Sequence, residues 1–331
     1  MLLAADIGAT KTILAFFSSE QGSYSPLYER EVTTAGYPDL DALVLSFLNE
    51  TGLSIDRAVF GIAAPVKCGR AVMINMPWTV DEEHLKKTLC IERVHLLNDL
   101  EAIANSIPIL RGNDLYTLNK GIPQPGAPMA VIAPGTGLGE AFLIADGKDA
   151  MYRGLPSEGG HVDFAPTDVL EMDLLNHLRK KYDHVSYERL CSGPGIHNIY
   201  EFLKKSLFIE EPGWLAEELA RVDDPTPVIV HAAMDKKKRC RICEMALDIF
   251  TSILGSEAGN LALKVLAVNG VYIAGGISPR ILDVLRTGNF MERFKQKGRE
   301  SFIVEDIPVH VILNNRAGLL GAAAYGLGRI V

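Results

Sequence analysis

The sequence LLAADIGATKTILAFF, residues 2–17, consists of two apolar runs joined by a short turn that contains glycine. Apolar runs on either side of such a turn are typical of two strands that form a hairpin. The same pattern returns about 130 residues later in AVIAPGTGLGEAFLIADG, residues 130–147. A pattern that recurs in this way predicts an internally duplicated chain.

Other segments extend this pattern into alternating strands and helices. Short apolar runs predict further strands at 58–65, 93–98 and 270–276. Apolar residues spaced three and four apart predict helices at 38–50, 99–107, 169–182 and 243–267. The alternation indicates an α/β protein.

The length of the chain and one proline-rich segment predict two lobes. A chain of 331 residues has room for two domains, because domains usually hold roughly 100 to 200 residues. The segment IPQPGAP, 122–128, precedes the second hairpin and is rich in turn-forming residues, which predicts a connection into the second lobe. We expect a small lobe from 1–109 plus 314–331 and a large lobe from 110–313. Mixed charge and several prolines make 209–241 a predicted surface excursion between helices.

The composition argues against several classes of partner. There are 41 acidic residues against 33 Lys and Arg, a formal charge of -8, so no global positive field attracts nucleic acid or anionic membranes. The N-terminal stretch lacks the pattern of a signal peptide, and no stretch reaches the ~18 uninterrupted apolar residues of a membrane span. The five cysteines are scattered, which suits a reducing compartment. We therefore expect a cytoplasmic protein.

Two glycine-containing turns carry the first chemical signal. DIGATKT, 6–12, and PGTGLG, 134–139, place glycine and threonine at the turn of each predicted hairpin. Glycine lets backbone N–H groups converge on a phosphate, although the first turn is also ordinary hairpin chemistry. The second turn holds three glycines in six residues, more backbone freedom than a reversal needs. The pair suggests phosphates held by both turns, with Asp6 beside Mg²⁺.

These turns and several further motifs resemble the bacterial glucokinase family, within the superfamily of sugar kinase, Hsp70 and actin ATPases. The resemblance covers nearly the whole chain, in the segments DIGATKT, LLNDLEAIANSIP, PGTGLGEAFL, SEGGHVDFAP, HVSYERLCSGPG, GNLALKV, VYIAGGISPR and NNRAGLLGAAAYGL. It implies two ribonuclease-H-like α/β lobes around a central cleft. It also implies that Mg-ATP phosphorylates glucose at the 6-hydroxyl, giving glucose 6-phosphate and ADP, and it favours a homodimer.

The segment LLNDLEAIA, 96–104, puts Asn98 and Asp99 where a predicted strand ends and a helix begins. An aspartate there can be a helix N-cap. It can also be the carboxylate that accepts the proton of the attacking hydroxyl in a kinase. The resemblance implies that Asp99 is the catalytic base and contacts the sugar, and that Asn98 is a sugar ligand.

The segment SEGGHVDF, 157–164, sets Glu158 and His161 around two glycines, which suits a loop that turns both side chains into one pocket. Carboxylates and imidazoles bind sugar hydroxyls, and each buried partner left unpaired penalises a wrong analogue by ~1 to 3 kcal/mol. The resemblance makes Glu158, His161 and Glu188 sugar ligands. A structural hydrogen-bonding role for His161 and a plain helix-surface role for Glu188 remain open.

Two more glycine turns, CSGPG (191–195) and AGGISPR (274–280), lie near the nucleotide by resemblance, although they are also an ordinary helix start and a strand–helix turn. Ala9 departs from the family, in which a second glycine is common. The loop INMPW, 74–78, is either a wall of the sugar site or core. The implied ATP or phosphate contacts are Asp6, Gly8, Ala9, Thr10, Lys11, Gly135, Thr136, Gly137, Gly193, Gly275 and Gly276, and the implied Mg²⁺ contact, through water, is Asp6.

Alternatives differ in their expected metal and activity. Related sugar kinases carry a cysteine-rich zinc motif after Glu-Gly-Gly-His, whereas no cysteine closely follows His161 here. Cys240 and Cys243 lack a second pair, so we expect no zinc. Three rival functions remain: a kinase for another hexose such as mannose or an amino sugar, a non-catalytic sugar-sensing regulator, and an ATPase or acyl-phosphate kinase. A regulator of this kind usually has a DNA-binding head, for which the first predicted strand leaves no room.

Overall fold

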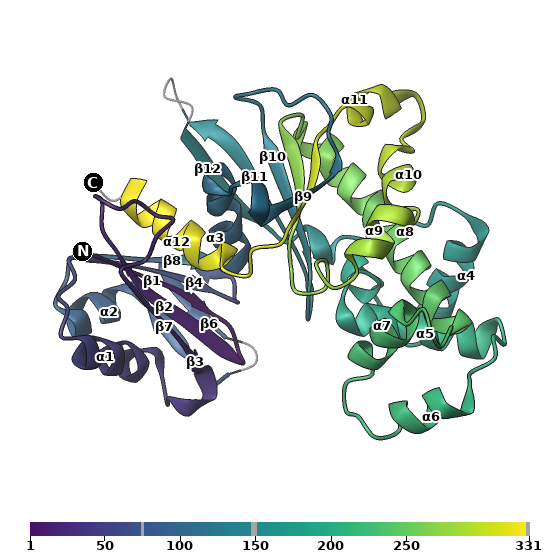
Figure 1. The fold of residues 1–331 in the computed structure, drawn as a ribbon, viewed down its shortest axis with the longest axis horizontal. Helices are drawn as coiled ribbons and strands as arrows, with labels where there is room; N and C mark the ends of the chain where they lie inside the picture. The colour runs from purple at the N-terminus through teal and green to yellow at the C-terminus, as the bar shows by residue number, and fades with distance from the viewer. Residues whose placement is uncertain (74–75, 147–150, 329–331) are drawn as a thin grey trace. The chain divides into compact units, whose positions relative to one another are not determined.

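The structure is a computed structural model that describes residues 1–73, 76–146 and 151–328. It divides into two compact units, coloured along the chain in Figure 1. Unit 1 comprises Met1–Leu115, Ala141–Pro156 and Asn314–Val331, and unit 2 comprises Tyr116–Glu140 and Ser157–Leu313.

Unit 1 is built on a five-stranded mixed sheet of order β3-β2-β1-β4-β8. Its strands are β1 (Leu2–Ile7), β2 (Lys11–Phe17), β3 (Tyr28–Thr33), β4 (Arg57–Ile62) and β8 (Arg93–Asn98). Strand β1 pairs antiparallel with β2 and parallel with β4, and β4 pairs parallel with β8. Because the carboxyl ends of parallel strands lie at one edge of a sheet, the ends of β1 and β8 bring Asp6 and Asn98 to the same edge.

Helices cover both faces of this sheet (Figure 1). The helices are α1 (Leu40–Thr51) and α2 (Glu82–Leu89) on one face, and α3 (Asp99–Ser106) and α12 (Ala317–Gly328) on the other. Successive residues of a strand point to opposite faces, so Leu3 packs in the cluster that contains α1, whereas Leu2 packs in the cluster that contains α12. Unit 1 also contains a small sheet of β5 (Val66–Lys67), β6 (Arg70–Val72) and β7 (Thr79–Asp81).

The second large sheet has the order β12-β11-β10-β13-β14-β9. Its strands are β9 (Leu115–Asn119), β10 (Met129–Pro134), β11 (Leu138–Asp146), β12 (Met151–Ser157), β13 (Gly270–Ile273) and β14 (Val309–Ile312). Its first five strands repeat the order of the sheet in unit 1: β12, β11, β10, β13 and β14 correspond to β3, β2, β1, β4 and β8. Strands β10, β13 and β14 are parallel. The internal duplication and the ribonuclease-H-like arrangement predicted from the sequence are confirmed.

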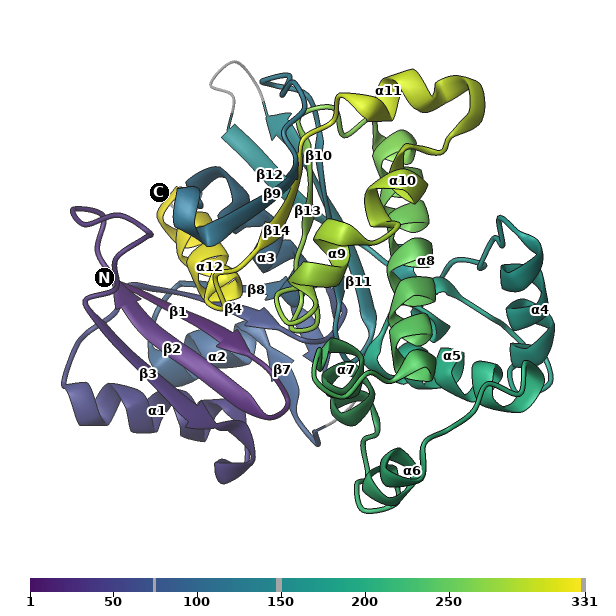
Figure 2. The same ribbon diagram turned by 45° about the vertical axis from the view of Figure 1, so that its right-hand side comes forward.

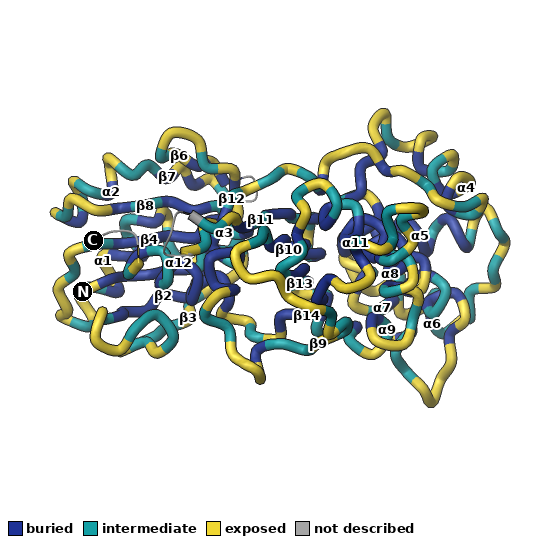
Figure 3. The backbone as a smooth tube through the Cα atoms, turned by 90° about the horizontal axis from the view of Figure 1, so that it is seen from above, coloured by how far each residue is buried: buried dark blue, intermediate teal, exposed yellow. Residues whose placement is uncertain are grey.

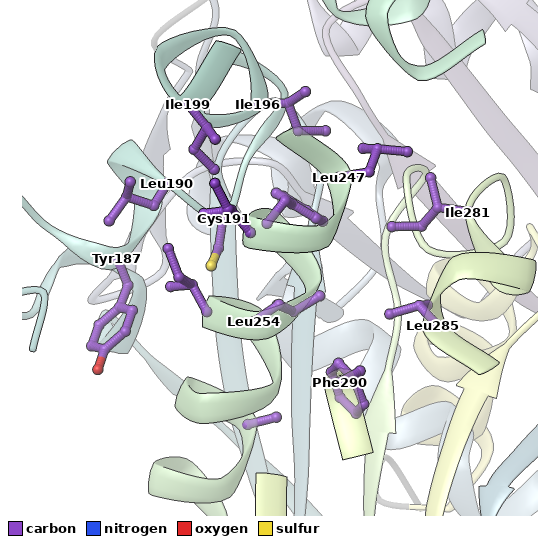
Figure 4. Close-up of a cluster of buried hydrophobic side chains, with 14 of the residues drawn as sticks. Tyr187, Leu190, Cys191, Ile196, Ile199, Leu247, Leu254, Ile281, Leu285 and Phe290 are labelled. Carbon is purple, nitrogen blue, oxygen red and sulfur yellow. The ribbon is translucent and has the colours of Figure 1, made fainter. Parts of the chain in front are cut away.

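Unit 2 has its core around the long helix α8 (Arg241–Val265), beside which α5 (Gly193–Ser206), α7 (Thr226–Met234) and α10 (Phe290–Lys295) are seen in Figure 2. Figure 4 shows part of this core, where Leu190 and Cys191 lie on one side and Leu247 and Leu254 of α8 on the other. The remaining helices of unit 2 are α4 (Val169–Leu178), α6 (Gly213–Leu219), α9 (Leu282–Thr287) and α11 (Ser301–Glu305). Short 3-10 helices occupy Thr34–Gly36, Ile107–Ile109, Gly112–Asp114, Gly159–His161, Tyr187–Arg189 and Gly298–Glu300.

The expected surface excursion at 209–241 is wrong in part, because this region contains α6 and α7. Leu215, Ile229 and Ala232 from these helices are buried in the core of unit 2. The prolines misled the prediction because they stand at the starts of both helices, where proline is well tolerated. Figure 3 shows how buried and exposed residues alternate along the chain.

The loop 74–78 was predicted to be either a wall of the sugar site or core. Trp78 is buried in the core of unit 1, whereas residues 74 and 75 of the same predicted loop lie outside the described residues. Of the helices in 1–73, 76–146 and 151–328, none has the length and apolar character that a membrane crossing requires.

Candidate active site

The first predicted phosphate turn connects β1 to β2 in unit 1. The Gly8 N–H donates to the Lys11 carbonyl at 3.0 Å, and the Thr34 hydroxyl donates to the Gly8 carbonyl at 2.8 Å. Thr10 is exposed, Ala9 is half-buried, and the Lys11 ammonium donates to the Glu31 carboxylate at 2.9 Å. The turn is therefore tight and anchored from below, with its tip open to solvent.

Asp6 lies just before this turn, against the start of α12. A Cβ built on Gly318 would lie 2.7 Å from the Asp6 Oδ2, so a larger residue there would require this carboxylate to shift. Burial, and then the charge of Asp99, raises the pKa of Asp6 to about 6, while Lys11 acts in the opposite direction. The two carboxylates are thus near enough to repel each other, and a divalent cation beside them would relieve that repulsion.

Asn98 and Asp99 lie at the junction of β8 and α3, as predicted. The cap of α3 is Asn98, whose Oδ1 accepts from the Leu100 N–H at 3.0 Å while its Nδ2 donates to the Ala64 carbonyl at 3.2 Å. Asp99 is the first residue of the helix, and its Oδ1 also accepts from Leu100 N–H at 2.9 Å. The N-cap alternative for Asp99 is therefore wrong, because its neighbour takes that position.

The three predicted sugar ligands of unit 2 come together in space. His161 Nε2 lies 3.9 Å from Glu158 Oε2 and 3.9 Å from Glu188 Oε2. The side chain of Glu188 is 26% exposed, against 68% for Glu158 and 57% for His161. Two carboxylates and an imidazole thus converge at one accessible place, which suits a ligand with several hydroxyl groups.

The first residues of β11 fix this group of three. The Leu138 N–H donates to Glu188 Oε2 at 3.1 Å, which excludes a plain helix-surface role for Glu188. A Cβ on Gly160 would lie 2.0 Å from the Leu138 carbonyl oxygen, so the loop of Glu158 and His161 packs directly on the same strand. A Cβ on Gly137 would lie 2.5 Å from the Glu188 carboxylate. The group of Glu158, His161 and Glu188 therefore adjoins the second glycine turn.

On its other side, this turn lines a cavity of about 670 Å³ within unit 2. The turns predicted near the nucleotide meet there: Gly193 N–H donates to the Gly135 carbonyl at 2.8 Å, and a Cβ on Gly275 would lie 2.3 Å from the Pro134 carbonyl oxygen. Gly275 adopts a φ of +80°, which other residues rarely adopt. The predicted residues that line the cavity are Gly135, Thr136, Gly193 and Gly276.

The start of α5 gives this cavity an anion-binding character. Gly193 and Pro194, the first residues of the helix, line the cavity, and Ser192 caps the helix by accepting from Gly195 N–H at 3.1 Å. The positive end of the dipole of a long helix favours phosphate groups nearby. In α5 the dipole acts without free N–H groups at the first three positions, because Gly193 and Gly195 already donate to Gly135 and Ser192, and proline has no N–H. The volume matches that of common small-molecule sites.

The sequence did not predict the far wall of the cavity. The wall comes mainly from α7 and the residues before it, in the region expected to be a surface excursion. The Thr226 hydroxyl donates to the Gly193 carbonyl at 2.8 Å, which ties α7 to the start of α5. Val230, Met234 and Ile277 give this wall an apolar part, as is usual in small-molecule sites. The unpredicted wall residues are Asp224, Thr226, Pro227, Val230, His231, Met234, Ile277 and Arg280.

Known proteins share the sequence pattern and the fold of this chain. A family model described as glucokinase matches residues 3–328. The glucokinase of Nostoc punctiforme is 41% identical, over 98% of this chain and 98% of its own. A glucokinase crystal structure from an Antarctic psychrotroph has a TM-score of 0.83 at 31% identity, over 98% of this chain and 97% of its own. A glucokinase of the ROK family from Streptomyces griseus, solved with glucose and AMPPNP, shares the fold at a TM-score of 0.64 and 19% identity, over 97% of both chains.

The fold, with its duplicated ribonuclease-H-like sheets, is that of the sugar kinases with two actin-like lobes. Within this class, the chain belongs to the glucokinase family, a family of enzymes.

Proposed function

We propose that this protein transfers the γ-phosphoryl group of ATP to the 6-hydroxyl of glucose, giving glucose 6-phosphate and ADP. One observation carries the proposal: the turn Gly135–Gly137 lines the cavity at one end and touches the carboxylate of Glu188 at the other. A phosphate at the turn and a hydroxyl bound by Glu188 would therefore be neighbours. That neighbourhood is what a sugar kinase requires.

In this proposal the sugar is bound by carboxylates, an amide and an imidazole. Glu188 is held by Leu138 N–H, so its free lone pairs have a fixed direction. Glu158 and His161 share the loop that packs on β11. Each group can accept from or donate to a hydroxyl, and a sugar that leaves one of them unpaired is disfavoured. The sugar ligands that we propose are Asn98, Asp99, Glu158, His161 and Glu188.

Asp99 is the general base of the proposed reaction. Its carboxylate stands at the first turn of α3, close enough to Asp6 that its charge helps to raise the pKa of Asp6. A carboxylate in this setting can accept the proton of the 6-hydroxyl as the oxygen attacks the γ-phosphorus. Asn98 keeps Asp99 oriented, because its amide joins the start of the helix to the Ala64 carbonyl.

The nucleotide occupies the 670 Å³ cavity in this proposal. The adenosine lies against the apolar wall of α7, and the phosphates lie at the start of α5 and at the two glycine turns. The N–H groups of Gly8 and Gly135 donate within their own turns, so the other backbone N–H groups of the turns stabilise the charge that develops on the transferred group. The AMPPNP complex of the structural relative described above is consistent with a nucleotide of this type.

Asp6 is the residue that we propose to hold Mg²⁺, through water. The donor chemistry fits, because Asp6 offers hard oxygen atoms and its repulsion with Asp99 would be relieved by a cation. Bound there, Mg²⁺ would neutralise charge on the β- and γ-phosphates. Within the described ranges no group of three or more His, Cys, Asp or Glu is arranged to hold a metal ion.

The proposal also covers the lobe boundaries, the location and the oligomeric state of the enzyme. We assign residues 1–109 plus 314–331 to the small lobe and 110–313 to the large lobe, and we place the enzyme in the cytoplasm as a homodimer. Light scattering at micromolar concentration tests the last point. A mass near twice the 36.1 kDa of the chain supports it, and a mass equal to that of the chain contradicts it.

A coupled assay of ADP release tests the function. The purified protein is supplied with Mg-ATP and, in separate reactions, glucose, mannose, glucosamine and N-acetylmannosamine. We expect turnover with glucose to exceed the others. Turnover with another hexose would keep the kinase and change the substrate. Sugar binding without turnover would favour a sensing regulator, and ATP hydrolysis indifferent to sugar would favour an ATPase.

A further inference from the structure

A buried carboxylate with no role in the proposed reaction lies beneath the sugar loop, defined here as Ser157–His161. Glu140 is the third residue of β11 and is 1% exposed. A Cβ built on Gly159 would lie 1.9 Å from the Glu140 Oε2. The carboxyl group of Glu140 therefore fills the space in which a side chain of residue 159 would stand.

The environment of Glu140 gives it no cation of its own. Its Oε1 atom is buried and, within the described part of the chain, meets no hydrogen-bond partner. The groups of α8 that face it are Glu257, which is fully buried, and Lys264. Lys264 already donates to Glu257 at 3.0 Å, as Asn260 does at 2.9 Å. One ammonium group thus serves two carboxyl groups.

Among the described residues, the other titratable groups of this region lie in the adjoining core and in the sugar loop. Cys191, fully buried in the adjoining core, has its pKa raised by burial and by the charges of Glu257 and Glu140 (Figure 4). Burial and Glu257 also raise the pKa of Tyr187. Lys297 donates to the Ser256 carbonyl and faces Glu257. The sugar loop itself contributes Glu158 and His161, which are exposed.

We propose that Glu140 is a positioning residue: its protonated carboxyl group supports the sugar loop through Gly159, and its ionisation releases the loop and weakens hexose binding. The inference rests on the proposed roles of Glu158 and His161. A protonated carboxyl group tolerates burial against a glycine backbone, whereas an ionised one seeks water. Water reaches Glu140 only if the loop moves.

The charge balance supports this assignment. Burial, and then the charge of Glu257, raises the pKa of Glu140 to about 8, while Lys264 acts in the opposite direction. The group is therefore protonated at neutral pH and ionises in mildly alkaline solution. If the ionised form binds hexose poorly, linkage requires the KM for glucose to rise by up to tenfold per pH unit above that value.

The test compares the wild-type enzyme with Glu140→Gln, a neutral variant of the same shape. The KM for glucose, the KM for ATP and kcat are measured from pH 6.5 to 9.5. We expect the glucose KM of the wild type to rise by about tenfold at pH 9 relative to pH 7, and that of Glu140→Gln to stay nearly flat. The KM for ATP should depend on pH in the same way in both proteins. Identical glucose profiles for the two proteins would overturn the inference.

A second pair of variants tests the contact without reference to pH. Gly159→Ala places a methyl group on the Glu140 carboxyl and should raise the glucose KM at pH 7. Adding Glu140→Ser makes room, so the double variant should have a lower glucose KM than Gly159→Ala alone. A double variant that is worse than Gly159→Ala would contradict the proposed contact.

Hydrogen exchange separates a failure of this inference from a failure of the proposed function. The amides of Gly159, His161 and Val162 donate to acceptors of the sugar loop. Beyond the intrinsic effect of pH, their protection should fall at pH 9 in the wild type and persist in Glu140→Gln. If protection differs in this way and added hexose does not change it, the link between Glu140 and the loop is supported and the sugar-binding role of the loop is refuted. Equal protection in the two proteins would overturn the link itself.

Discussion

The close packing of α12 on α3 makes Gly321 a sensitive position. A Cβ built there would lie 1.6 Å from the Ala102 carbonyl oxygen and 2.9 Å from the Ser106 nitrogen. Favourable contacts between heavy atoms lie at about 3.5 to 4.0 Å, so Gly321→Ala forces the helices apart by roughly 2 Å. Both atoms that it meets belong to the backbone, which cannot be relieved by rotating a side chain.

The cost of this change follows from two opposing effects. Overpacking costs about 1 to 3 kcal/mol, and the rigid backbone contact places this case near 3. Replacing glycine by alanine within a helix returns about 1 kcal/mol. The net destabilisation is about 2 kcal/mol, which corresponds to a Tm lower by about 4 to 8 °C in a unit of this size. Because α3 begins at Asp99, we expect kcat to fall as well.

Thermal unfolding followed by circular dichroism, together with the coupled assay, measures both effects. Gly328→Ala is the matched control: it lies in the same helix, and a Cβ there meets nothing within 4 Å. The control should keep or slightly raise the Tm. A Gly321→Ala protein whose Tm lies within ~1 °C of the wild type would refute the close packing of the two helices.

Four further substitutions probe the site. Because the pKa of Asp6 is raised to about 6, the ionised carboxylate destabilises the fold above that pH. Asp6→Asn should therefore have a higher free energy of unfolding in urea than the wild type at pH 7.5, and this difference should shrink as the pH falls toward 3.8. The variant should also lose turnover. A difference that does not change with pH contradicts this prediction. Gly276→Val, where a Cβ meets nothing within 4 Å, should fold and raise the ATP KM alone, whereas Gly275→Val should fold poorly; equal ATP KM values for Gly276→Val and wild type would remove the nucleotide from this cavity. Glu188→Gln should raise the glucose KM about tenfold, through loss of a charged hydrogen bond, and an unchanged glucose KM would remove Glu188 from the sugar site.

Local sequence patterns predicted much of the fold. The two hairpins, the strands at β4, β8 and β13 and the helix α8 follow from apolar periodicity and glycine turns. The duplication also follows, because it repeats a recognisable local pattern. The short strands β5 to β7 and the helices α9 to α11 do not, because each has only a few residues and depends on its neighbours for burial.

The site divides in the same way. Asp6, Asn98 and Asp99 stand at strand ends, where the carboxyl edge of a sheet makes polar residues noticeable. The wall on α7 was missed because prolines at a helix start look like those of a loop. Glu140 gave no signal at all: β11 also contains Asp146, so an acidic residue in this strand is not conspicuous in the sequence. Only the packing of Gly159 and α8 makes Glu140 a buried acid.

The central claim is that Asp99 serves as the base in phosphoryl transfer to a hexose. The most direct measurement is the kcat of Asp99→Asn with glucose and Mg-ATP, on protein whose circular dichroism and Tm match the wild type. General-base catalysis contributes about 10²- to 10⁴-fold, so we predict a loss of that size. Near-normal turnover by a correctly folded Asp99→Asn protein would contradict the account.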